Sequence, residues 1–343
     1  MFTLNSTPGR TCLVDGKEFL FFSGYSYLGM NHVKEFTKLI KEGIDKYGIL
    51  FPSSRISNTR LALYEEFENT LSEMTGLEET VSFSSGFLAG KTISNILSDH
   101  ENILVAPQTH PALDLKSTQK LNAIDFNNWS NDIAEIINTS NKKEFVLASD
   151  SVNILTAEIN DFSFLKKIKK DKKIICLIDD SHGIGIPGTG TGTASSLIKK
   201  ENIEYIICYS LSKAFNIEGG AVSCSKIFAN KLRTHPNYTG STAINPALIH
   251  AFLKSKKIYS LQKEKLFQNI LLLKKNLPPH FIKKDFDLPI FICEKENAEE
   301  IFYKKKIIIS SFAYPHPSSK KINRIIVSAL HTTKDIKKLR EIY

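Results

Sequence analysis

The chain has 343 residues, of which 42% are hydrophobic, and a formal net charge of +9. This length exceeds one average domain and predicts a large domain with a smaller lobe. No apolar run approaches the ~18 residues that a membrane span needs, and the first residues lack the pattern of a secretory signal, so we expect a cytoplasmic protein without a membrane segment.

The lysines are scattered along the chain, and no nucleic-acid-binding motif accompanies them. We interpret the charge as solvated helix faces rather than a nucleic-acid surface, although it could attract coenzyme A or an acidic carrier protein. The cysteines are odd in number and mostly lie in apolar runs, so buried thiols are expected. No closely spaced His/Cys cluster appears, so no metal site is predicted.

Apolar residues at helical spacing predict a helix from Val33 to Tyr47 and another from about Thr59 to Met74. Short apolar runs then alternate with helical stretches, at 80–83, 103–105, 145–148, 174–178 and 205–208. This alternation predicts an α/β fold with a mainly parallel sheet flanked by helices. Ligands of such sheets bind at the carboxyl ends of the strands.

The composition changes near residue 235. A long helix is predicted next, over about 247–273, followed by apolar runs at 289–293, 307–309 and 325–327 and a helix from about residue 335. We therefore predict a large domain over residues 30–235 and a smaller α+β domain formed by 1–29 and 236–343.

Three residue types in a fixed order suggest a pyridoxal phosphate (PLP) site. Lys213 follows an apolar run and precedes Gly219-Gly220, while Asp179 and His182 lie upstream. PLP needs a lysine for its aldehyde, an acid for its pyridine nitrogen and a partner for its ring oxygen. Taken alone, Lys213 could be a surface lysine, Asp179 a strand-end carboxylate and His182 a turn histidine. Their joint order and spacing favour the cofactor site.

Ser84-Ser85-Gly86-Phe87 lies between a predicted strand and a predicted helix. Amides at such a helix start form an anion site suited to the cofactor phosphate, although Ser-Gly also caps helices routinely. His110 could stack on the cofactor ring or cap a helix.

The chain resembles the α-oxoamine synthase family of fold-type I PLP enzymes, which condense an amino acid with an acyl thioester and release carbon dioxide. The similarity runs from about Phe22 to Tyr343. The matching motifs are Tyr27-Leu28-Gly29, Ser54-Arg55, Tyr64-Glu65-Glu66-Phe67-Glu68, Ser84-Ser85-Gly86-Phe87, Asp179-Asp180-Ser181-His182-Gly183, Ser210-Leu211-Ser212-Lys213-Ala214 and Ser328-Ala329-Leu330-His331-Thr332.

The resemblance implies a role for each matching residue. Lys213 would bind the cofactor aldehyde, Asp179 its pyridine nitrogen and His182 its ring oxygen, while His110 would stack on the ring. The implied phosphate ligands are Ser85, Gly86, Phe87 and Ser210, together with Thr242 from a neighbouring subunit of a homodimer with shared active sites. Arg324 matches the arginine that binds the amino-acid carboxylate, although it could also be a surface charge at a sheet edge.

Four residues depart from the family pattern. Ile154 replaces a serine near the cofactor, Tyr64 replaces a histidine, and Tyr25 and Ser26 replace a polar pair. These changes affect substrate recognition more than the lysine chemistry. The implied reaction is the condensation of L-alanine with pimeloyl-CoA or a pimeloyl carrier protein in biotin biosynthesis. A synthase using glycine or serine with another thioester, an aminotransferase, and a catalytically silent scaffold are the alternatives.

Overall fold

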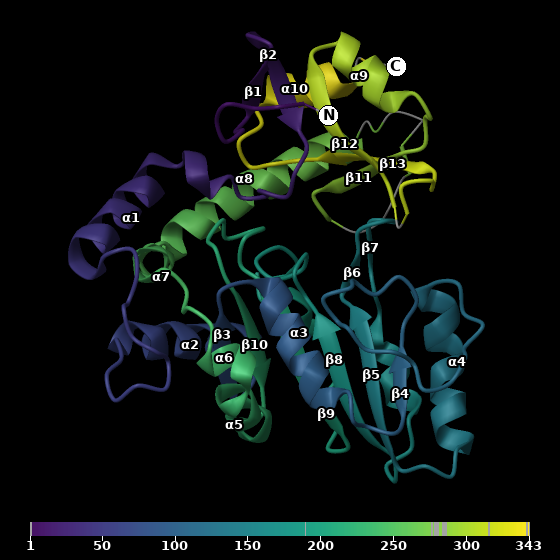
Figure 1. Ribbon diagram of the computed structural model, residues 1–343. Coiled ribbons are helices and arrows are strands. Elements are labelled where there is room, and N and C mark those ends of the chain that lie inside the picture. Colours follow the sequence, from purple (N-terminus) through teal and green to yellow (C-terminus); the bar gives the residue numbers. More distant parts are fainter. Residues whose placement is uncertain are drawn as a thin grey trace.

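The computed structural model describes residues 2–188, 190–275, 277, 281–282, 287–314, 316–340 and 342. A six-stranded sheet has the order β3-β10-β9-β8-β5-β4 (Figure 1). Its strands are β3 (Glu79–Phe83), β4 (Ile103–Val105), β5 (Glu144–Asp150), β8 (Lys173–Asp179), β9 (Ile203–Ser210) and β10 (Gly220–Cys224). All pairs are parallel except those of β10, which runs antiparallel to β3 and β9. The predicted α/β fold is confirmed.

Helices cover both faces of this sheet. On one face α3 (Gly86–Leu97) and α5 (Lys226–Thr234) pack on alternate residues of the strands, such as Val146 and Ala148. On the other face α4 (Phe126–Thr139) and the 3-10 helix η2 (Phe162–Lys167) pack on the intervening residues, such as Phe145 and Leu147. The period of two therefore divides one continuous apolar run between two cores.

A smaller five-stranded sheet has the order β1-β2-β12-β13-β11. Its strands are β1 (Thr11–Val14), β2 (Lys17–Phe22), β11 (Ile290–Cys293), β12 (Ile307–Ala313) and β13 (Lys321–Ile326). The N-terminal hairpin β1-β2 joins the C-terminal strands because β2 pairs in parallel with β12. Both chain ends consequently lie in one lobe (Figure 1). The boundaries at residues 29/30 and 235/236 stay a prediction.

The remaining elements connect the two sheets or cover them. They are η1 (Met30–His32), α1 (Lys34–Tyr47), α2 (Ala62–Thr75), the hairpin of β6 (Val152–Asn153) and β7 (Glu158–Ile159), η3 (Gly192–Ser196), α6 (Pro236–Thr239), α7 (Pro246–Lys254), α8 (Lys256–Lys275), α9 (Ala298–Lys304) and α10 (Thr333–Arg340). None of the helices in the described ranges is long and apolar enough to span a membrane. All five cysteines are buried, as predicted.

The single helix predicted over 247–273 is wrong, because α7 ends at Lys254 and α8 begins at Lys256. Ser255, between them, is fully buried, and its hydroxyl donates to the carbonyl of Ala251 at 2.5 Å. A serine that hydrogen-bonds the carbonyl four residues earlier competes with the helical ladder and bends helices. The apolar periodicity of the sequence continues across residue 255. The sequence pattern therefore does not reveal the break between the two helices.

His331 ties the two ends of the chain together. Its Nδ1 accepts from the backbone N–H of Ser328 at 3.0 Å, so the neutral ring carries its proton on Nε2, which donates to the carbonyl of Phe21 at 3.0 Å. The ring stacks on Phe22 with 3.8 Å between centroids. Burial lowers the pKa of His331 to about 4, so the folded protein keeps this histidine neutral.

We predict that His331 makes stability fall as the pH falls. The unfolded chain takes up a proton near pH 6.5 and the folded chain only near pH 4. Between these values His331 should cost about 1.4 kcal/mol of unfolding free energy per pH unit. Denaturant unfolding of the native protein and of His331→Gln at pH 7 and pH 5 measures this loss. An equal loss in both proteins would contradict the prediction.

Candidate functional site

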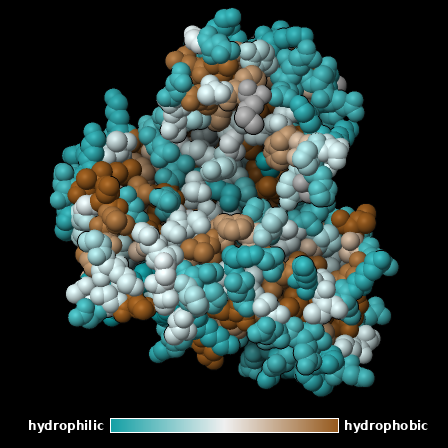
Figure 2. Space-filling view, viewed as in Figure 1, coloured by the Kyte–Doolittle hydropathy of each residue, from teal (hydrophilic) through white to brown (hydrophobic). Residues whose placement is uncertain are grey.

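The carboxyl ends of the parallel strands border a cavity of about 260 Å³. Figure 2 shows a hollow in the surface between the two lobes. Of the predicted site residues, all except Thr242 and Arg324 line this cavity. The complete lining is Ser85, Gly86, Phe87, His110, Ala112, Asp150, Val152, Ile154, Asp179, Ser181, His182, Ser210, Ser212 and Lys213.

Strand register brings the acidic groups together. Asp150 ends β5 directly opposite Asp179, which ends β8. Asp179 is 7% exposed, and its Oδ1 accepts from the backbone N–H of Ser181 at 2.9 Å. Burial and the neighbouring Asp179 both raise the pKa of Asp150 well above its usual range. Asp150 therefore lies beside Asp179 as a second acid, with a raised pKa.

Lys213 follows β9 and lines the cavity beside these two aspartates. Burial lowers the pKa of Lys213, and the charges of Asp179 and Asp150 oppose that shift. A lowered pKa leaves a larger fraction of the amine neutral at pH 7. Lys213 is thus suited to attack a carbonyl or to accept a proton.

Two histidines flank the lysine. The backbone N–H of His110 donates to both carboxylate oxygens of Asp150, at 3.1 and 3.2 Å. The Nδ1 of His182 lies 2.7 Å from the hydroxyl of Tyr27. Burial lowers the pKa of both rings, and for His182 the positive charges of Lys213 and Arg324 lower it further. Both rings are consequently neutral at pH 7.

Residues at the start of α3 line one wall of the cavity. Ser85 caps this helix, because its hydroxyl accepts from the N–H of Leu88 at 3.1 Å. The first amides of a helix have no intrahelical acceptor and can bind an anion. Gly86 is required there, since a Cβ at this position would lie 2.5 Å from the Cβ of Ser210. Capping and anion binding are thus compatible at this helix start.

Arg324 and Thr242 lie outside the cavity lining. Arg324, in β13, is half-buried and donates from Nη1 to the carbonyl of Ile154 at 3.3 Å. Its guanidinium lies 4.6 Å from the Phe312 ring centroid, and its buried Nε has no partner within the described ranges. Thr242 is exposed. A single chain therefore does not bring Thr242 to the cavity.

Several lining or contacting residues were not predicted from the sequence, among them Asp150, Ser212 and Tyr27. Asp150 was missed because the predicted strand stopped at residue 148, two residues short of its end. Ser212 lies within a quoted motif, and its hydroxyl lies 2.8 Å from that of Ser210. Tyr27 also lies in a quoted motif, but its contact with His182 depends on how the lobes meet.

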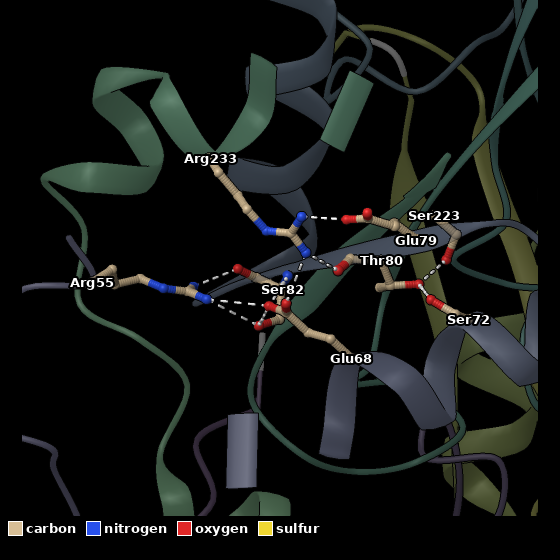
Figure 3. A network of polar contacts seen from close by, with 8 residues as sticks. All are labelled: Arg55, Glu68, Ser72, Glu79, Thr80, Ser82, Ser223 and Arg233. Atoms are coloured by element: carbon tan, nitrogen blue, oxygen red, sulfur yellow. Dashed lines mark hydrogen bonds and ion pairs between the residues drawn. The ribbon is translucent and has the colours of Figure 1, made fainter. Parts of the chain in front are cut away.

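An ionic network supports the strand that precedes the helix start (Figure 3). Arg55 donates to the carbonyl of Ser82 at 2.5 Å and to Glu68 at 3.2 Å, and its side chain is 6% exposed. Glu68 also accepts from the Ser82 hydroxyl and from Arg233. The charged groups of this network bond one another and the backbone of β3. The Ser54-Arg55 motif therefore has a structural role beside β3.

Comparisons with known proteins identify relatives of the whole chain. The sequence profile of the family "Aminotransferase class I and II" matches residues 18–342. An 8-amino-7-oxononanoate synthase of Lysinibacillus sphaericus is 27% identical over 94% of this chain and 87% of its own. One from Buchnera aphidicola is 25% identical over 97% of this chain and 90% of its own.

Solved structures share the fold. Serine palmitoyltransferase of Sphingomonas wittichii has a TM-score of 0.79 and 14% identity, covering 99% of this chain and 90% of its own. The 8-amino-7-oxononanoate synthase of Francisella tularensis has a TM-score of 0.73 and 23% identity, covering 94% and 96%. A structure described as SPT with PLP has a TM-score of 0.85 and 17% identity, covering 100% of this chain and 91% of its own.

These findings confirm the predicted resemblance and fold class. The family profile covers the whole six-stranded sheet, most of the five-stranded sheet and all residues that line the cavity. The chain belongs to the aminotransferase class I and II family and has the fold of the fold-type I PLP enzymes.

Proposed function

We propose that the chain is a PLP-dependent α-oxoamine synthase that forms 8-amino-7-oxononanoate from L-alanine and a pimeloyl thioester, in biotin biosynthesis. The observation that carries this proposal is the meeting of Lys213, Asp179 and His182 in one cavity beside the start of α3. The named relatives support the choice of alanine and pimeloyl over other substrates.

The residues present fit PLP. Lys213 offers a buried amine of lowered pKa for the aldehyde, and Asp179 a buried carboxylate for the pyridine nitrogen. The amides of Gly86 and Phe87, with the hydroxyl of Ser210, can hold the phosphate. His110 supplies a neutral ring for stacking. When bound, PLP supplies an electron sink for negative charge at the amino acid's α-carbon.

Two side chains would then act on the substrate amino acid, one by accepting a proton and one by binding its carboxylate. The neutral Lys213 amine accepts the α-proton of alanine, as its lowered pKa favours. Arg324 binds the alanine carboxylate, for which its unpartnered Nε offers a donor. The α-carbon forms a bond to the acyl carbon as the thiolate leaves, the carboxylate is then released as carbon dioxide, and the proton held by Lys213 returns to the α-carbon.

The acyl donor has room beside this site. A cavity of about 560 Å³ shares Ser85, Gly86 and the Ser210 loop with the smaller one, and Tyr25 and Ser26 line it. Two of the four residues that depart from the family pattern, Tyr25 and Ser26, therefore border the space proposed for the thioester. The net charge of +9 favours a phosphorylated coenzyme A or an acidic carrier as donor.

A homodimer is part of the proposal. Thr242 is exposed and lies away from its own chain's cavity, so it could serve the phosphate of a second copy. Apolar side chains at the end of α1 and in the segment after it are also exposed, namely Ile44, Ile49, Leu50 and Ile56. Such exposed apolar side chains are typical of an interface.

Two other reactions are favoured by particular observations. The family match favours an aminotransferase, which uses the same cofactor residues. The structural likeness to serine palmitoyltransferase favours a synthase that takes serine and a different thioester.

We predict that Lys213→Ala abolishes covalent attachment of PLP and turnover, because no other lysine lines the cavity among the described residues. Borohydride reduction followed by peptide mapping should place the cofactor on Lys213 in the native protein. Lys41→Ala, which changes an exposed lysine of α1, is the matched control and should retain both properties. A cofactor label on another lysine would remove Lys213 from this role.

For Arg324→Ala we expect alanine binding to weaken by roughly 2 to 4 kcal/mol while PLP stays bound, because a charge-assisted bidentate contact is lost. Titration of the cofactor absorbance with alanine measures the affinity. Arg324→Lys keeps the positive charge but cannot make the bidentate contact. Its affinity for alanine should therefore lie between those of the native protein and Arg324→Ala. Unchanged alanine affinity in Arg324→Ala would exclude Arg324 from the site.

The substrate proposal predicts that alanine with a pimeloyl thioester yields 8-amino-7-oxononanoate, carbon dioxide and free thiol. A matrix of alanine, glycine and serine against pimeloyl and palmitoyl donors, read by mass spectrometry, tests it. If a carrier protein is the donor, turnover should fall steeply with salt, because surface charge attraction is screened over ~8–10 Å. Turnover of only serine with palmitoyl-CoA, or amino transfer without carbon dioxide release, would assign another reaction.

A further inference from the structure

Tyr27 joins the small-sheet lobe to the cavity. It lies between β2 and η1, is 1% exposed, and its hydroxyl lies 2.7 Å from Nδ1 of His182 in the turn after β8. The ring centroids are 6.2 Å apart and tilted by 56°, so the hydroxyl, and not the ring face, makes the contact.

The direction of this hydrogen bond follows from the partners available. No second acceptor is bonded to the Tyr27 hydroxyl in the part of the chain that the structure describes. If His182 donated from Nδ1, the phenol proton would be buried without an acceptor, which costs free energy. Burial raises the pKa of Tyr27, so the phenol keeps its proton. Tyr27 therefore donates, and the neutral His182 carries its proton on Nε2.

The backbone around Tyr27 is held on two sides. The Tyr27 carbonyl accepts from the N–H of Ala329 at 2.9 Å, and the Leu28 carbonyl accepts from the Gln262 side chain at 2.9 Å. Gly29 has a φ of 63°, and a Cβ there would collide with Leu330. Both contacts come from C-terminal segments, so the hydroxyl position is determined by how the small-sheet lobe docks.

We propose that Tyr27 is a positioning residue, which holds His182 in the Nε2-protonated tautomer and so directs a hydrogen-bond donor to an oxygen bound in the Lys213 cavity. His182 lines that cavity, and its Nε2 has no partner among the described residues. The identity of the acceptor, the PLP ring oxygen, rests on the proposed function, while the tautomer does not.

The first test uses the cofactor-free protein with ¹⁵N-labelled histidine. Two-bond ¹⁵N–¹H correlation distinguishes the tautomers, and His182→Gln identifies the His182 signals among the nine histidines. We expect native His182 to be neutral with its proton on Nε2, and Tyr27→Phe to give a mixture of both tautomers. An Nδ1-protonated ring in the native protein, or an unchanged ring in Tyr27→Phe, would overturn the proposal.

The second test uses the PLP-loaded protein. Tyr27→Phe should lower kcat about tenfold, leave KM for alanine little changed, and shift the pH titration of the cofactor absorbance. Tyr205→Phe is the matched control, since it removes a hydroxyl that donates to the Ile198 carbonyl at 2.9 Å and does not line the cavity. Equal kcat and titration in all three proteins would overturn the proposal. Failure to bind PLP would refute the proposed function but leave the tautomer result intact.

Discussion

The burial of one lysine amine between two carboxylates is the constraint on which this site depends. Burial removes water from the Lys213 amine and so lowers its pKa. The negative charges of Asp179 and Asp150 oppose this shift and stabilise the charged amine in the cavity. The two carboxylates meet because β5 and β8 are parallel and in register at their last residues. Since parallel strands deliver their carboxyl ends to one edge, the sheet itself assembles the charged groups.

The second constraint is that the chain ends build one lobe. The pairing of β2 with β12 places Tyr27 and Arg324 near the same histidine, although almost 300 residues separate them in the chain. His331 reinforces this pairing through the Phe21 carbonyl. Arg55 and Glu68 brace β3, the strand that ends at Phe83 just before the start of α3. The site is thus held from two lobes and by two separate polar clusters.

Neighbouring residues in one motif can have opposite environments. Asp179 lines the cavity, whereas Asp180 is fully buried and accepts from the hydroxyls of Ser151 and Thr193 at 2.5 and 2.6 Å. Burial raises the pKa of Asp180 to about 6. Asp180 therefore anchors the turn that carries His182, and Asp179 is left to face the cavity. The motif resemblance distinguished the two carboxylates, which composition and spacing alone would not.

The fold class, most strands of the large sheet, the family and part of the cavity lining were predictable from the sequence alone, because apolar periodicity and short motifs are local. The sequence did not reveal β10, whose run Gly220–Cys224 is short and begins with glycine. Three features became visible only in the folded chain: Asp150 faces Asp179, Ser255 divides a helix, and Tyr27 reaches His182. Each depends on strand register, a buried side-chain bond or lobe docking, and none of these is encoded by a spacing along the chain.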